Sequence, residues 1–202
     1  IFWGSPEGAP TDNYLSIVAN NSTTIASYDM ETAAGWTAGA AGDNATGGTW
    51  TRVDPNGTAA QPEDDTTATG TRAWITGQNA AGDLNGGDVD AGTTTLVSPT
   101  LNLATASDPY INYWRWYSNN QGSNPNSDTL VVGISFNNGS SWTTVETVGP
   151  AGAESGGGWF AHAFRVSDFG TPNSQVKLRF VASDLGASST VEAAIDKLKV
   201  MV

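Results

Sequence analysis

The sequence predicts an all-β protein built as a two-sheet sandwich, and three observations carry that prediction. Glycine occurs 24 times in the 202 residues while charged residues make up only 14%, a composition typical of short strands joined by polar turns. Apolar and polar residues alternate through much of the second half, as in strands with one buried face. No segment has helical periodicity beyond about one turn. About ten short strands at this spacing favour a sandwich.

The first half of the chain predicts five short strands, separated by acidic and glycine-rich loops. They are expected in the segments NYLSIVA, TTIASYDME, TWTRVD, RAWITG and TTTLVSP. These segments contain the β-branched and aromatic residues that suit a pleated surface. The glycine-rich stretches between them mark turns and loops.

The second half begins with a strand that has two aromatic faces, in the segment YINYWRWYSNN. Trp114 and Trp116 alternate with Tyr113 and Tyr117, so each pair lies on its own side of the strand. A tryptophan in a sandwich is usually a core residue, and we expect Trp114 and Trp116 to be buried. The alternative is that both form a platform on which a sugar stacks.

A hairpin is expected next, in residues 130–148. Apolar residues alternate from Leu130 to Phe136, and the dipeptide Asn138-Gly139 accepts the positive φ of a tight turn. The return strand runs from Trp142 to Val148. We interpret the turn segment SFNNGSSW as a hairpin turn capped by its tryptophan.

Three further strands complete the predicted sandwich, in the segments WFAHAFRV, QVKLRFVAS and TVEAAIDKLKVMV. The first two have one apolar face and one more polar face, which predicts half-buried strands. The apolar positions of the last strand change parity between Ile195 and Leu198. We therefore expect a β-bulge at Asp196 and Lys197, a feature that often re-aims a side chain at a site.

Charge and composition exclude several classes of function. The net charge of −12 opposes binding to nucleic acid, which depends on Lys and Arg displacing counterions. Cysteine is absent, so disulfides and thiol chemistry are excluded. His162 is the only histidine; it is expected to pack within a strand face, and zinc or a Ser-His-Asp triad is improbable. No apolar run is long enough to insert into a membrane.

From Tyr28 to Val202 the chain resembles the MAM-like jelly-roll modules of secreted multidomain bacterial proteins. The likeness rests on YDMETAAGW, TWTRVDPNGTAAQPEDD, GGDVDAGTTTLVSPTLNL, YWRWYSNN, GGWFAHAFRVSDF and FVASDLGASSTVEAAIDKLKV. It implies a jelly-roll sandwich over residues 28–202, secreted or at the cell surface. Residues 1–27 fall outside the resemblance and are expected to form an arm or linker with a strand-like segment.

Acidic residues gather in two glycine-rich stretches, PEDD and GGDVDAG. Like charges this close repel, and a calcium ion bound by oxygen ligands would explain them. The resemblance implies a calcium site between Glu31, with Asp29 near it, and Asp196 in the last strand. The complete expected ligand set is Asp29, Glu31, Asp64, Asp65, Asp88, Asp90 and Asp196. The alternative is that these loops are only solvated and keep the protein soluble.

Further candidate residues are a possible catalytic carboxylate pair, several tryptophans and a set of glycosylation sites. Glu192 and Asp196 form a possible carboxylate pair for glycoside hydrolysis, although no catalytic signature surrounds them. No role is assigned to the tryptophans nearer loops: Trp36, Trp50, Trp74 and Trp159. The candidate glycosylation sites are Asn20, Asn21, Asn44, Asn56 and Asn138.

The sequence therefore predicts a non-catalytic extracellular module for adhesion or interaction, stabilised by calcium. The alternative is a subunit of an extracellular filament made of identical chains. There the N-terminal arm, with the apolar residues Ile1, Phe2 and Trp3, would bind a neighbouring subunit or another protein partner by strand addition. A third possibility is a carbohydrate-binding module with glycans as ligands.

Overall fold

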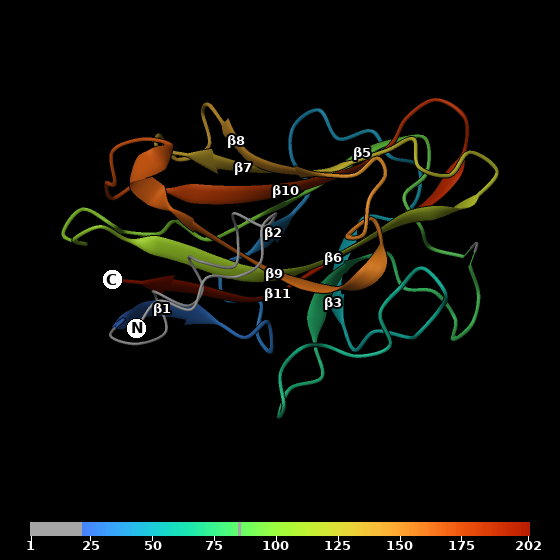
Figure 1. Ribbon diagram of the computed structural model, residues 1–202, viewed down its shortest axis with the longest axis horizontal. Helices are drawn as coiled ribbons and strands as arrows, with labels where there is room; N and C mark the ends of the chain where they lie inside the picture. The colour runs from blue at the N-terminus through green and yellow to red at the C-terminus, as the bar shows by residue number, and fades with distance from the viewer. Residues whose placement is uncertain (1–21, 85) are drawn as a thin grey trace, which may run out of the picture.

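A computed structural model describes residues 22–84 and 86–202, which form two antiparallel sheets that face each other (Figure 1). The prediction of an all-β sandwich is confirmed. The six-stranded sheet has the order β3 (Trp50–Val53), β4 (Ala73–Thr76), β11 (Ser189–Met201), β6 (Tyr110–Gly122) and β9 (Gly156–Arg165), with β1 (Thr24–Tyr28) also pairing with β11. The five-stranded sheet has the order β2 (Thr37–Ala38), β5 (Gly92–Val97), β10 (Lys177–Asp184), β7 (Leu130–Ser135) and β8 (Thr143–Val148).

The core lies between the sheets and follows the predicted alternation. Leu178 and Phe180 of β10 and Ile111 and Tyr113 of β6 are fully buried in it. Only a short 3₁₀ helix, Val166–Asp168, interrupts the strands of the described part, and that part contains no helix suited to crossing a membrane.

Two predicted irregularities are present. The register of β11 against β6 shifts between Asp196 and Lys199, and Lys197 has a φ of 48°, which confirms the β-bulge. Asn138 and Gly139 both have positive φ, at 56° and 93°, as the hairpin prediction requires.

The first described strand spans the predicted boundary between the arm and the sandwich. β1 begins at Thr24 and pairs with the end of β11, so the sheet includes residues assigned to the arm. The segment NYLSIVA and the residues Ile1, Phe2 and Trp3 lie outside the described residues. The filament interface therefore stays a prediction.

The tryptophans of the described part differ in burial. Trp36, Trp50 and Trp74, to which the sequence assigns no role, are buried, and Trp50 and Trp74 lie in β3 and β4, the strands predicted from TWTRVD and RAWITG. Trp114 and Trp116 are half-buried and point away from the inter-sheet core, because Tyr113 and Tyr117 take the inward positions of β6. The prediction that Trp114 and Trp116 are core residues is therefore wrong for the main core.

Candidate functional site

The outer face of the six-stranded sheet is covered by the connection between β3 and β4, residues 54–72. Trp116 Nε1 donates a hydrogen bond to Ala60 O at 2.7 Å, and Trp159 Nε1 donates to Asp64 O at 3.0 Å. The two indoles meet edge to face, with an interplanar angle of 70° and centroids 6.1 Å apart. This pair anchors the covering loop and does not form a flat sugar platform.

Beneath the covering loop, Glu192 of β11 is completely buried. Its carboxylate accepts hydrogen bonds from Asn79 Nδ2 at 3.0 Å and Thr76 Oγ1 at 2.9 Å. Burial raises the pKa of Glu192 to about 8, and these hydrogen bonds only partly oppose the shift.

Asp196, four residues further along the same face, is also fully buried. Its Oδ2 accepts hydrogen bonds from Thr66 N at 2.9 Å and Thr66 Oγ1 at 2.6 Å. Burial raises the pKa of Asp196 as well. Because neither Glu192 nor Asp196 is accessible, the carboxylate pair considered for glycoside hydrolysis has no route to a substrate in this structure.

Part of the predicted calcium ligand set converges beside Gly70. Glu31 Oε1, Asp65 Oδ2 and Thr67 Oγ1 all lie within 2.5 Å of the point that a Cβ on Gly70 would occupy. Glu31 Oε1 also accepts hydrogen bonds from the backbone N–H groups of residues 71 and 72. Burial raises the pKa of Asp65, and the charges of Asp64 and Glu31 contribute to the shift.

The remaining predicted ligands are divided between two places. Asp29 is exposed and accepts a hydrogen bond from Glu31 N, and Asp65 lies close enough to raise the pKa of Asp196. Asp88 has other electrostatic neighbours, Asp90 and Asp184; burial and their charges raise its pKa to about 6. Within residues 22–84 and 86–202, no three acidic or histidine side chains are grouped tightly enough to bind a metal on their own.

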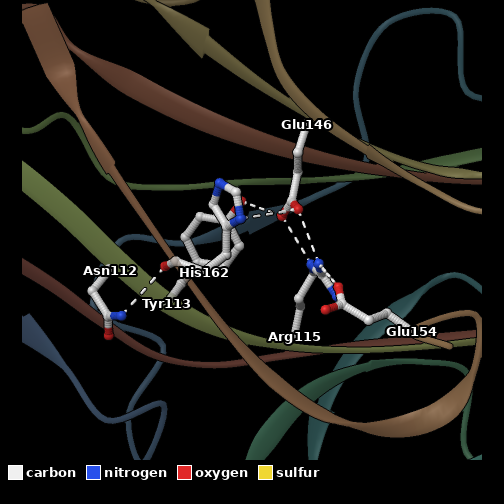
Figure 2. A network of polar contacts seen from close by, with 6 residues as sticks. All are labelled: Asn112, Tyr113, Arg115, Glu146, Glu154 and His162. Atoms are coloured by element: carbon white, nitrogen blue, oxygen red, sulfur yellow. Dashed lines mark hydrogen bonds and ion pairs between the residues drawn. The ribbon is translucent and has the colours of Figure 1, made fainter. Parts of the chain in front are cut away.

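A polar network joins side chains of β6 and β9 in one sheet to a side chain of β8 in the other (Figure 2), and β8 and β9 are each the last strand of their sheet. The Arg115 guanidinium, which is only 4% exposed, pairs with Glu146 at 2.9 Å and also with Glu154. Tyr113 donates its hydroxyl hydrogen bond to Glu146 Oε1 at 2.5 Å. Arg115, Glu146 and Glu154 line a cavity of about 330 Å³ together with the loop that follows β8.

His162 completes this network, with Nδ1 3.2 Å from Glu146 Oε2 and its ring 5.5 Å from that of Tyr113. The prediction that His162 packs within a strand face is confirmed. Burial lowers the pKa of His162, although Glu146 opposes the shift. Both carboxylates are held by the Arg115 cation, so the cluster is arranged as an internal ion network rather than as an acid and base pair.

A second cavity, of about 260 Å³, lies on the outer face of the five-stranded sheet. β5 contributes Thr95 and Val97, β10 contributes Lys177 and Arg179, and Trp142 lies just before β8. The turn Asn138-Gly139 and the loop after β2 form its rim. We call this cavity the face groove.

The rim of the face groove is fixed by one carboxylate. Asp43 Oδ2 accepts hydrogen bonds from Ala40 N at 3.0 Å and Thr95 N at 2.8 Å, and its Oδ1 accepts one from Thr95 Oγ1 at 2.7 Å. The loop after β2 is thereby attached to β5. The groove wall is therefore formed in the protein without a ligand.

Sequence reasoning missed the three residues that distinguish the face groove. Trp142 was interpreted as the cap of a turn, and Lys177 and Arg179 only as the outward polar positions of a strand. The available signal was that both cations occupy alternate positions of one strand and so share its outer face. The sequence does not reveal that Trp142 lies beside that face.

The described candidate glycosylation sites are all exposed. Asn44 Oδ1 accepts a hydrogen bond from Thr93 N, Asn56 Nδ2 donates one to Asn79 O, and Asn138 Oδ1 accepts one from Thr100 Oγ1. Asn20 and Asn21 lie outside the described residues. Glycosylation of these sites stays a prediction.

No family model and no curated protein matches the chain. Among solved structures, the K1 cleaved adhesin domain of Lys-gingipain from Porphyromonas gingivalis is similar, with a TM-score of 0.52 and 16% identity over 90% of this chain and 98% of that one. The K2 domain of Lys-gingipain gives a TM-score of 0.50 and 16% identity over 88% and 98% of the two chains. TmCBM61, solved with β-1,4-galactotriose, gives a TM-score of 0.47 and 12% identity over 82% and 86%. The likeness to the two adhesin domains shows a shared β-sandwich fold.

Proposed function

We propose that this chain is a non-catalytic recognition module that binds a saccharide in the face groove. One observation carries the proposal: the two sheets have different outer faces. Residues 54–72 cover the six-stranded sheet through Trp116 and Trp159, whereas the five-stranded sheet has a preformed groove with an aromatic and polar lining. Such a lining suits sugar rings, which offer both apolar faces and hydroxyl groups.

The fold is compatible with this role, since one sandwich architecture supports many functions. A MAM-like module of a secreted or cell-surface protein fits the proposal, with adhesion as the wider role. The third possibility derived from the sequence, a carbohydrate-binding module, thus becomes the preferred form of the interaction module. Its aromatic contact is Trp142 rather than the pair Trp114 and Trp116.

The test is a glycan array probed with the wild-type protein, followed by titration of any ligand found. We expect Trp142→Ala to weaken binding at least about tenfold, because a stacked aromatic side chain is removed. Trp114→Ala is the matched control, since it removes a half-buried tryptophan from the other sheet. Equal losses in both variants, or no loss with Trp142→Ala, would exclude the face groove.

We also propose that calcium stabilises the covered sheet through the oxygens beside Gly70. Glu31, Asp65 and Thr67 would contribute ligands there, and backbone carbonyls and waters would complete a shell of roughly six to eight oxygens. A calcium ion would neutralise carboxylates that otherwise repel each other. The role is structural, because the ion would join the first strand region to the covering loop.

Calcium removal is expected to lower the melting temperature by several degrees, since a ligand that binds only the native state stabilises it by mass action. The measurement is thermal unfolding in calcium and in EGTA. Glu31→Gln should largely abolish the difference, whereas Asp168→Asn, which changes an exposed carboxylate in the 3₁₀ helix, should retain it. Identical melting curves of the wild-type protein in calcium and EGTA would contradict the calcium proposal.

A further inference from the structure

The face groove contains two cations in a strongly acidic chain. Only 8 of the 202 residues are Lys or Arg, against 20 Asp and Glu, yet Lys177 and Arg179 lie side by side on the outer face of β10. Neither forms an ion pair with the described acidic residues. Asp43, the carboxylate at the rim, is engaged with Ala40 and Thr95.

Arg179 is held in place without an acidic partner. Its guanidinium carbon lies 4.9 Å from the centre of the Trp142 ring, and its strand neighbour on β7 is Gly133. A Cβ at Gly133 would come within 3.2 Å of Arg179 Nε, so the glycine makes room for the side chain to lie along the sheet. Stacking on an indole orients a guanidinium while leaving its in-plane N–H groups available.

One donor of the guanidinium group has no hydrogen-bond acceptor among the described residues. Arg179 Nε is buried and has no partner among the described residues, which costs free energy for a charged donor. Burial lowers the pKa of Arg179, and no carboxylate opposes the shift. A planar acceptor with two oxygens matches the donor geometry of this side chain.

From this arrangement we infer that the face groove selects a carboxylated saccharide, with the carboxylate on Arg179 and Lys177 as a second positive charge. The inference rests on the proposed saccharide function and adds the class of sugar. Trp142 and Val97, which both line the groove, supply apolar surface for the ring that carries the carboxylate. Thr95 and Asn138 at the wall and rim offer polar atoms to hydroxyl groups.

Two features favour an acidic sugar over an acidic peptide or a general polyanion. The groove lies on the face of a sheet whose backbone groups are paired on both sides of β10, so an extended peptide cannot bind there by strand addition. The net charge of −12 repels polyanions from the protein as a whole. An anion must therefore be recognised locally, by the two groove cations.

The experiment compares a panel of uronate-containing oligosaccharides with the carboxyl-reduced form of each, by titration calorimetry on the full chain. We expect at least one acidic member to bind and its reduced form to bind about tenfold or more weakly, because hydrogen bonds to a charged group are lost. Arg179→Lys, which keeps the charge but not the planar fork, should cost about tenfold. Lys177→Gln should weaken binding severalfold, and binding should fall with added salt.

Lys199→Gln is the matched control, because it removes an exposed lysine from β11 in the other sheet; it should leave the affinity unchanged. Equal binding of acidic and reduced sugars, with loss in Trp142→Ala, would overturn the carboxylate assignment while leaving the proposed function intact. Equal binding of sulfated analogues would also overturn it, since charge alone would then decide. Absence of binding to every glycan, neutral or acidic, would overturn both.

Discussion

Replacing Arg115 with Met is expected to destabilise the protein by about 3–5 kcal/mol, the cost of leaving a buried charge without its partner. Arg115 is 4% exposed and its main partner Glu146 is 11% exposed, so the pair is largely shielded from bulk water. Glu146 would retain Tyr113 and His162 as neighbours (Figure 2), but neither carries a fixed positive charge. The measurement is denaturant unfolding at neutral pH.

Two further variants separate the lost charge from lost packing. Glu154→Gln removes only the outer carboxylate, which is 48% exposed, and should cost less than about 1 kcal/mol. Adding Glu146→Gln to Arg115→Met removes the stranded charge and should restore part of the stability. If Arg115→Met alone stays within about 1 kcal/mol of wild type, the network does not hold the sheet edges together.

Glu192→Gln is expected to stabilise the protein above neutral pH. Burial raises the pKa of Glu192 from its usual 4.5 to about 8 in the folded state, so the folded protein binds a proton that the unfolded chain releases. The contribution is fully favourable below pH 4.5 and is lost as the pH rises through about 8. At pH 8 the neutral amide should gain about 4 kcal/mol over the carboxylate.

The measurement is the free energy of unfolding from pH 5 to pH 9 in EGTA, which removes any contribution from calcium. The wild-type curve should fall over this range, and the Glu192→Gln curve should be flatter. Asp88, whose pKa is raised to about 6, contributes in the same direction, so Glu192→Gln does not remove the whole slope. Glu63→Gln, a change at an exposed carboxylate of the covering loop, should reproduce the wild-type curve.

The strands were predictable because their patterns depend on local spacing. The alternation of apolar and polar residues predicts which faces of β7 and β10 are buried. The dipeptide Asn138-Gly139 predicts the hairpin, and the change in parity of the apolar positions at Asp196 predicts the bulge. All three signals depend on neighbours within a few residues. They need no knowledge of how the strands are ordered in the sheets.

The site was not predictable to the same degree, because it depends on packing between distant segments. The sequence predicts that Asp64, Asp65, Asp88 and Asp90 belong to one set of calcium ligands. In the structure, Asp65 and Asp88 have different electrostatic neighbours. Trp116 lies in a strand whose alternation is typical of core residues. It is partly buried by the covering loop rather than by the inter-sheet core, and the periodicity of the sequence does not reveal that loop.

The same limit explains the missed groove. Trp142, Arg179 and Thr95 come from separate parts of the chain and meet only because β5, β10 and β7 are neighbours in one sheet. Gly133 gives room to Arg179 only in the observed register. Strand order and register are tertiary properties, which one sequence does not specify through composition or local pattern.

The most direct test of the central claim is an NMR titration of the tryptophan indole N–H signals with a saccharide identified on the array. If the face groove is the binding site, the signal of Trp142 should shift. The signals of Trp116 and Trp159, whose N–H groups are hydrogen-bonded beneath the covering loop, should stay in place. Shifts at Trp116 and Trp159 with an unchanged Trp142 would place the ligand on the opposite sheet and contradict the account.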